Sequence, residues 1–200
     1  MELLDELNKY YPDDRRIFVE KVDFVGETPY LILRFKLADY IDEEDGVDQR
    51  WKVNIKGFKE ANIKAETSTS VECEMEHPLS WQYQDTNTSL YFRGVPEDIW
   101  KLYYDLTLLH NKLFEYYLEV DRFLNPVYFD KLLNAGAGLI AKGPHRLMLE
   151  YAALLEKHNV KTSMILNKGL NQDLDNSPLI VMFIAKTYIV AEEYNAIRLL

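Results

Sequence analysis

The 200-residue chain has 48% hydrophobic and 28% charged residues, a composition that is typical of folded domains and excludes wholesale disorder. Its 33 acidic and 23 basic residues give a net charge of −10, which argues against binding to the phosphate backbone of nucleic acids. The single cysteine, Cys73, cannot form an internal disulfide, which fits a reducing compartment.

The chain shows no targeting or membrane-spanning segment in its sequence pattern. Residues 1–6 contain acidic but no basic side chains, whereas a signal peptide needs a basic stretch followed by an apolar one. The longest apolar run, 179–185, is too short to cross a bilayer. We therefore expect a cytoplasmic protein that does not associate with membranes.

Up to about residue 95, apolar and polar residues alternate with a period of two, which predicts strands with one buried face. Turn-forming residues separate these runs, and the whole pattern predicts an antiparallel β-meander of six or seven strands. The side chains expected on the apolar face include Leu33, Phe35, Trp51, Val53, Ile55, Cys73, Trp81 and Phe92.

The polar face of these strands carries charges of both signs. Two rows are basic, with Arg34, Lys36, Arg50, Lys52 and Lys56. One row is acidic, with Glu72, Glu74 and Glu76. Opposite charges on neighbouring strands stabilise a solvated face by about 0.2–1 kcal/mol per pair, which is the simplest interpretation. The alternative is that the acidic row forms a docking surface for a basic partner.

After residue 95 the apolar spacing becomes helical. Pro96, Glu97 and Asp98 favour a helix start, and the helix is predicted to continue to about residue 117. Because this segment is apolar or aromatic almost all round, we expect it to be buried, with its Trp100, Tyr104 and Leu108 against the sheet, or to form a homodimer interface.

The remaining segments are shorter. We expect a helix at 127–134 that ends at Gly136, a helix from residue 144 to about residue 158, and a strand at 160–166. A strand to about residue 185 and a helix from about residue 188 are the favoured interpretation of the tail, and one helix over 179–200 is the alternative. The predicted fold is α+β, with a sheet half (1–95) and a mainly helical half (96–200) whose helices cover the apolar face of the meander in one integrated domain.

The sequence contains no catalytic, metal or cofactor motif that fits its context. The four histidines are scattered, and the Cys73–His77 pair lacks further metal ligands. The acidic loop 39–48 does not match the ligand positions of a calcium-binding EF-hand. The G-x-G-x-x-A run at 136–141 follows a predicted helix, whereas a dinucleotide fingerprint follows a strand. Glu115 and Glu119, one helical turn apart, are best explained as solvated charges.

One feature suggests a ligand. Lys142, His145 and Arg146 surround the predicted helix start at Gly143, where the free N–H groups already create positive potential. A bound phosphate, sulfate or carboxylate would resolve this accumulation of positive charge. In the alternative, Arg146 pairs with Glu150 and the other two cations reach water.

Two classes of function therefore remain open. The favoured hypothesis is a small acidic interaction protein, such as an immunity factor, antitoxin or adaptor, which binds a basic partner through charge and aromatic surface. Residues 1–95 carry 20 acidic and 12 basic side chains, so most of the net charge lies in the sheet half. The alternative is an enzyme or small-ligand binder with its site at 142–146.

Overall fold

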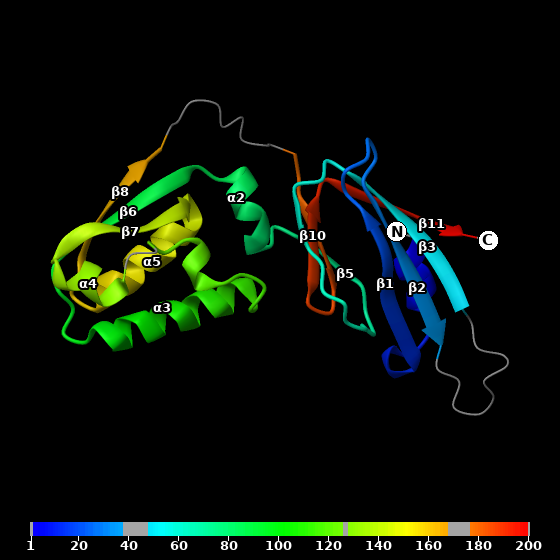
Figure 1. Ribbon diagram of the computed structural model, residues 1–200, viewed down its shortest axis with the longest axis horizontal. Helices are drawn as coiled ribbons and strands as arrows, with labels where there is room; N and C mark the ends of the chain where they lie inside the picture. Colours follow the sequence, from blue (N-terminus) through cyan, green and yellow to red (C-terminus); the bar gives the residue numbers. More distant parts are fainter. Residues whose placement is uncertain (1, 38–47, 126–127, 168–176, 200) are drawn as a thin grey trace. The chain divides into compact units, whose positions relative to one another are not determined.

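The computed structural model describes residues 2–37, 48–125, 128–167 and 177–199, which form two compact units (Figure 1). Unit 1 comprises residues 1–80 and 177–200, and unit 2 comprises residues 81–176. The contacts thus divide the chain at residues 80 and 176, whereas the sequence pattern changes near residue 95. The integration of the two halves into one domain stays a prediction.

Unit 1 consists of two four-stranded antiparallel sheets, with strand orders β1-β2-β3-β11 and β4-β10-β9-β5. Its strands are β1 (Arg15–Asp23), β2 (Tyr30–Leu37), β3 (Asp48–Lys56), β4 (Glu60–Asn62), β5 (Glu72–Met75), β9 (Ile180–Ile184), β10 (Thr187–Ala191) and β11 (Glu193–Leu199). Its helices are α1 (Glu2–Leu7) and the short 3-10 helices η1 (Pro12–Asp14) and η2 (Pro78–Ser80).

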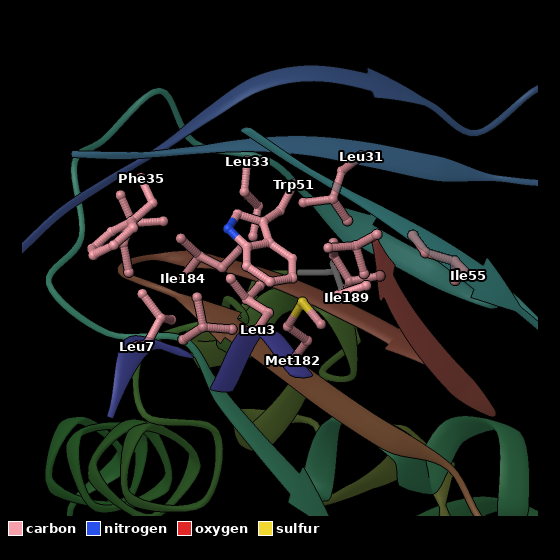
Figure 2. Packing of buried hydrophobic residues seen from close by; sticks show 14 of the residues in the cluster. Leu3, Leu7, Leu31, Leu33, Phe35, Trp51, Ile55, Met182, Ile184 and Ile189 are labelled. Carbon is pink, nitrogen blue, oxygen red and sulfur yellow. The ribbon is translucent and has the colours of Figure 1, made fainter. Parts of the chain in front are cut away.

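The core of unit 1 lies between the two sheets. Alternate residues of β2 and β3 are buried, so the predicted period and register of these strands are confirmed. Figure 2 shows Trp51 at the centre of this core, among side chains of β2, α1, β9 and β10. Because Trp51 is only 1% exposed, it contributes nearly all of its surface to the core.

Two expectations for unit 1 are wrong. Cys73 is exposed instead of buried, and Met75 beside it is 71% exposed. The segment after residue 187 forms strands β10 and β11 instead of a helix. Every residue of β10 is buried, so this strand shows no alternation that could have revealed it.

Unit 2 is built on a three-stranded antiparallel sheet of order β7-β6-β8, with β6 (Asn87–Arg93) between β7 (Ala137–Pro144) and β8 (Lys161–Leu166). Its helices are α2 (Trp81–Gln84), α3 (Ile99–Phe114), η3 (Val120–Arg122), α4 (Phe129–Asn134) and α5 (His145–Lys157). Helix α5 packs on all three strands and also contacts α3 (Figure 1). The layers of unit 2 are therefore sheet, α5 and α3.

The chain is α+β with antiparallel sheets, as predicted, but its arrangement differs from the expected single meander. The described strands belong to three sheets, and α3 packs on α4 and α5. The predicted strand around Trp81 is the short helix α2, in which Trp81 is partly exposed. The segment after Gly136 is β7, since the chain turns back there to pair with β6.

Candidate functional site

The acidic row predicted as a partner surface lies on and next to β5, which is an edge strand because β9 is its only neighbour among the described strands. All four residues of β5 are exposed, and so is Glu76 directly after it. Glu72 accepts a hydrogen bond from the Ser70 hydroxyl, 2.9 Å away. In the part of the chain that the structure describes, Glu74 and Glu76 form no ion pair. The edge thus presents backbone groups and carboxylates together.

The predicted basic rows lie in the other sheet of unit 1 and have different partners. Arg34 and Lys36 pair with Asp48, and Arg50 pairs with Glu20 at 2.5 Å. Lys56 lies 3.5 Å from Glu193. Four of the five basic side chains thus pair with carboxylates of their own sheet, whereas Lys52 Nζ lies over the Tyr30 ring, 4.4 Å from its centroid. The expected pairing of the basic rows with the acidic row is wrong, because the two lie in different sheets. No residue of the acidic row forms an ion pair with another described residue.

The second predicted site, at the start of α5, contains an acidic residue that the sequence analysis did not include. Asp85 Oδ2 accepts a hydrogen bond from the Arg146 backbone N–H at 2.7 Å and lies 3.5 Å from Arg146 Nε. The Arg146 guanidinium lies over the Trp81 ring, 5.0 Å from its centroid. His145 Nδ1 lies 3.2 Å from the hydroxyl of buried Thr88. The chain itself thus places an anion at this helix start.

The other predicted residues of this site have structural surroundings of their own. Gly143 is buried at the end of β7, and a Cβ there would come within 2.7 Å of a Phe123 ring carbon. Lys142 is exposed, and its backbone N–H donates to the Phe123 carbonyl. The alternative partner considered for Arg146, Glu150, is exposed and forms no such pair in the described structure. Binding of an external anion stays a prediction.

Helix α3 carries an exposed apolar stripe, which contradicts the expected burial of these side chains. Trp100, Tyr104 and Leu108 are 67%, 62% and 46% exposed, respectively. The opposite face, with Leu102, Leu106, His110 and Phe114, is buried instead. The helix begins after the N-cap Asp98, whose side chain accepts the Lys101 N–H at 2.9 Å. A helix that is aromatic or apolar on most sides does not show from its sequence which face packs inward.

A cavity of about 370 Å³ opens beside the N-terminal part of α3. Among the described residues, those that line it come from α3, from η3 and the residues after it, and from the start of α4: Trp100, Tyr103, Asp121, Leu124, Asn125, Tyr128, Phe129 and Asp130. The Tyr103 and Phe129 rings pack against each other, with centroids 5.1 Å apart. The sequence alone does not reveal this cavity, because the segments that line it are separated along the chain.

A buried polar chain connects α3 to α5. His110 Nδ1 lies 2.7 Å from the Tyr151 hydroxyl, and its Nε2 lies 3.0 Å from the Leu118 carbonyl. Burial lowers the pKa of His110 below its usual value of 6.5 and raises that of Tyr151. Both side chains are fully buried, and their hydrogen bond joins the two helices.

The other motifs also have structural explanations. In the described residues, no group of three or more His, Cys, Asp and Glu is placed to hold a metal ion. The acidic loop 39–48 lies outside the described residues, apart from Asp48. Most of the glycine-containing run 136–141 forms β7, and Glu115 is the C-cap of α3, so it does not share a helix with Glu119.

Comparisons with protein-family models, with curated proteins and with solved structures gave no match to this chain. In the described parts of the chain, none of the helices combines the length and the apolar character that crossing a bilayer requires.

Proposed function

We propose that this protein is a small acidic interaction protein, which binds a basic extended segment of a partner protein along strand β5. The observation that carries this proposal is the exposed edge of β5 with its acidic side chains, Glu72, Glu74 and Glu76. An edge strand offers unpaired backbone N–H and C=O groups, to which an extended segment can add as a further strand.

The negative charge of the β5 edge determines which segments can bind to it. Two copies of β5 would place like charges opposite each other, which disfavours self-association. A segment rich in Lys or Arg would instead meet carboxylates that have no ion-pair partner among the described residues. Such complementarity acts mainly on the association rate, because exposed charges steer the encounter and are screened beyond about 10 Å at 0.1 M salt.

The experiment compares two triple variants of equal net charge. Glu72→Gln, Glu74→Gln and Glu76→Gln change the charge from −10 to −7 at the edge, and Glu27→Gln, Glu115→Gln and Glu150→Gln make the same change elsewhere on the surface. The probe is a short extended peptide that alternates Lys with Thr or Val, immobilised for association kinetics.

We expect the edge variant to slow association and the matched control to stay close to the unmodified protein. We also expect added salt to slow association of the unmodified protein more than that of the edge variant. Equal rates for the two variants would refute docking at β5. If the edge variant binds more slowly than the control, the same pair of variants can be used to test a natural partner captured from cells with the unmodified protein.

Two further expectations belong to this proposal. We expect a cytoplasmic location, which the single Cys73 supports. A homodimer through α3 also stays a prediction, supported by the exposed stripe of Trp100, Tyr104 and Leu108. Sedimentation of the unmodified protein and of Tyr104→Glu tests it, because a charge at the middle of the stripe would separate the subunits.

A further inference from the structure

We infer that the cavity beside α3 is a binding site for an organic cation, an alkylammonium or guanidinium group. Its described lining combines four aromatic side chains, Trp100, Tyr103, Tyr128 and Phe129, with the carboxylates of Asp121 and Asp130. The site lies in unit 2 and shares no residue with the β5 edge, so this inference goes beyond the proposed function and does not depend on it.

The lining favours positive charge for two independent reasons. The face of an aromatic ring carries a negative quadrupole, which attracts a cation within about 6 Å of the ring centroid. The two carboxylates add full negative charges, and none of the described residues that line the cavity is Lys, Arg or His. An anionic ligand would be repelled, and a neutral one would leave the carboxylates without a counter-charge.

The chain already uses one of these rings in this way. Lys131 Nζ lies over the Tyr128 ring, 4.7 Å from its centroid. The Tyr128 ring thus attracts an ammonium group in this environment, and a ligand cation would use its other face or replace Lys131 there. Tyr128 and Trp100 are 72% and 67% exposed, so a ligand that covers them would remove apolar surface from water as well.

The chemistry of the lining also distinguishes an organic cation from a metal ion. Divalent metal ions require several oxygen or nitrogen ligands at once, and Ca²⁺ takes six to eight. Four of the eight described residues that line the cavity are aromatic, and only two are carboxylates. Among the described residues, no group of three or more His, Cys, Asp and Glu is placed to hold a metal ion. A volume of about 370 Å³ falls in the range of small-molecule sites and accommodates a quaternary ammonium group or a Lys or Arg side chain.

The test is a calorimetric and NMR titration of the full chain with defined probes. Choline represents a free quaternary amine, and Nα-acetyl-lysinamide and Nα-acetyl-argininamide represent protein side chains. The neutral control is 3,3-dimethyl-1-butanol, which has the shape of choline without its charge. We expect at least one cation to bind and to shift the Trp100 indole signal, and the tightest binder identifies the source of the cation.

Variants locate the binding. Trp100→Ala should weaken the affinity about fivefold or more, and Asp121→Asn and Asp130→Asn about fivefold each. The matched controls are Tyr116→Ala, which removes an exposed aromatic ring outside both the cavity lining and the stripe of α3, and Glu150→Gln, which removes a carboxylate elsewhere. Both controls should bind like the unmodified protein, and circular dichroism checks that every variant is folded.

Three results would overturn the inference. The first is that no cationic probe binds at concentrations up to about 10 mM. The second is that the neutral isostere binds as well as choline, since charge would then play no part. The third is that Tyr116→Ala weakens binding as much as Trp100→Ala, because a ring outside the cavity would then matter as much as one that lines it. None of these results bears on docking at β5, whose variants leave the cavity intact.

Discussion

Removing the Asp85 carboxylate should destabilise the start of α5. The residue before this helix is Pro144, which has no side-chain hydrogen bond to offer as a cap. Asp85 takes this role from 61 residues away by accepting the Arg146 N–H at 2.7 Å. In Asp85→Ala, that N–H loses its acceptor, and Arg146 is left beside the positive end of the helix dipole.

The size of the effect follows from the two contacts that are lost. Loss of an N-terminal cap costs about 0.5–2 kcal/mol. The Arg146 ion pair adds at most about 0.5 kcal/mol, because its cationic side chain is 46% exposed and the pair is screened by water. We therefore expect the free energy of unfolding to fall by about 0.5–2.5 kcal/mol.

Urea unfolding followed by circular dichroism measures this loss. Asp85→Asn is the informative companion, because its amide oxygen can still accept the N–H, and it should recover more than half of the loss. Glu150→Ala, an exposed position in the same helix, serves as the control. If Asp85→Ala unfolds within about 0.3 kcal/mol of the unmodified protein, the carboxylate does not cap α5 and the reasoning fails.

The same variant tests the predicted anion site at Lys142, Gly143, His145 and Arg146. In the unmodified protein, a phosphate has to compete with Asp85 for the helix start. In Asp85→Ala the N–H is free, so phosphate should bind more tightly and raise the unfolding midpoint more than in the unmodified protein. Equal effects of phosphate on both proteins would exclude binding at this helix start.

Two further predictions concern the cores of the two units. Trp51→Ala should lower the free energy of unfolding by about 3–5 kcal/mol, because the side chain is 1% exposed and its indole N–H donates to buried Gln49. A loss below about 1 kcal/mol in urea unfolding would contradict the central place of Trp51 in the core. Burial lowers the pKa of His110, so the unfolded chain binds a proton more readily and stability should fall as the pH drops below about 6.5. Unfolding midpoints at about pH 7.5 and 5.5 should therefore differ more for the unmodified protein than for His110→Gln, and equal differences would assign the effect to another group.

The sequence pattern was sufficient wherever burial follows a local period. The alternation through Leu33 and Phe35 and through Trp51 and Val53 predicted the strands β2 and β3 and their inward faces. It succeeded because one face of each strand packs in the core and the other meets water, which imposes a period of two on the residues themselves.

The pattern failed where both faces of a segment are buried or where its composition is uniform. The residues of β10 are all buried, so their sequence lacks the alternation that marks a strand. Helix α3 is aromatic or apolar on most sides, and the choice of the Leu102 face over the Trp100 face depends on where α4 and α5 lie.

The sequence by itself determined the α+β class, the position of the acidic row and the helix that begins at His145. Only the tertiary structure decided that β5 is an edge, that Asp85 reaches Arg146, and that Trp100 meets Asp121 and Asp130 around one cavity. The physical reason is the range of the interactions. Periodicity records the burial of neighbouring residues, whereas a strand edge, a distant cap or a cavity depends on contacts between segments that are far apart in the chain.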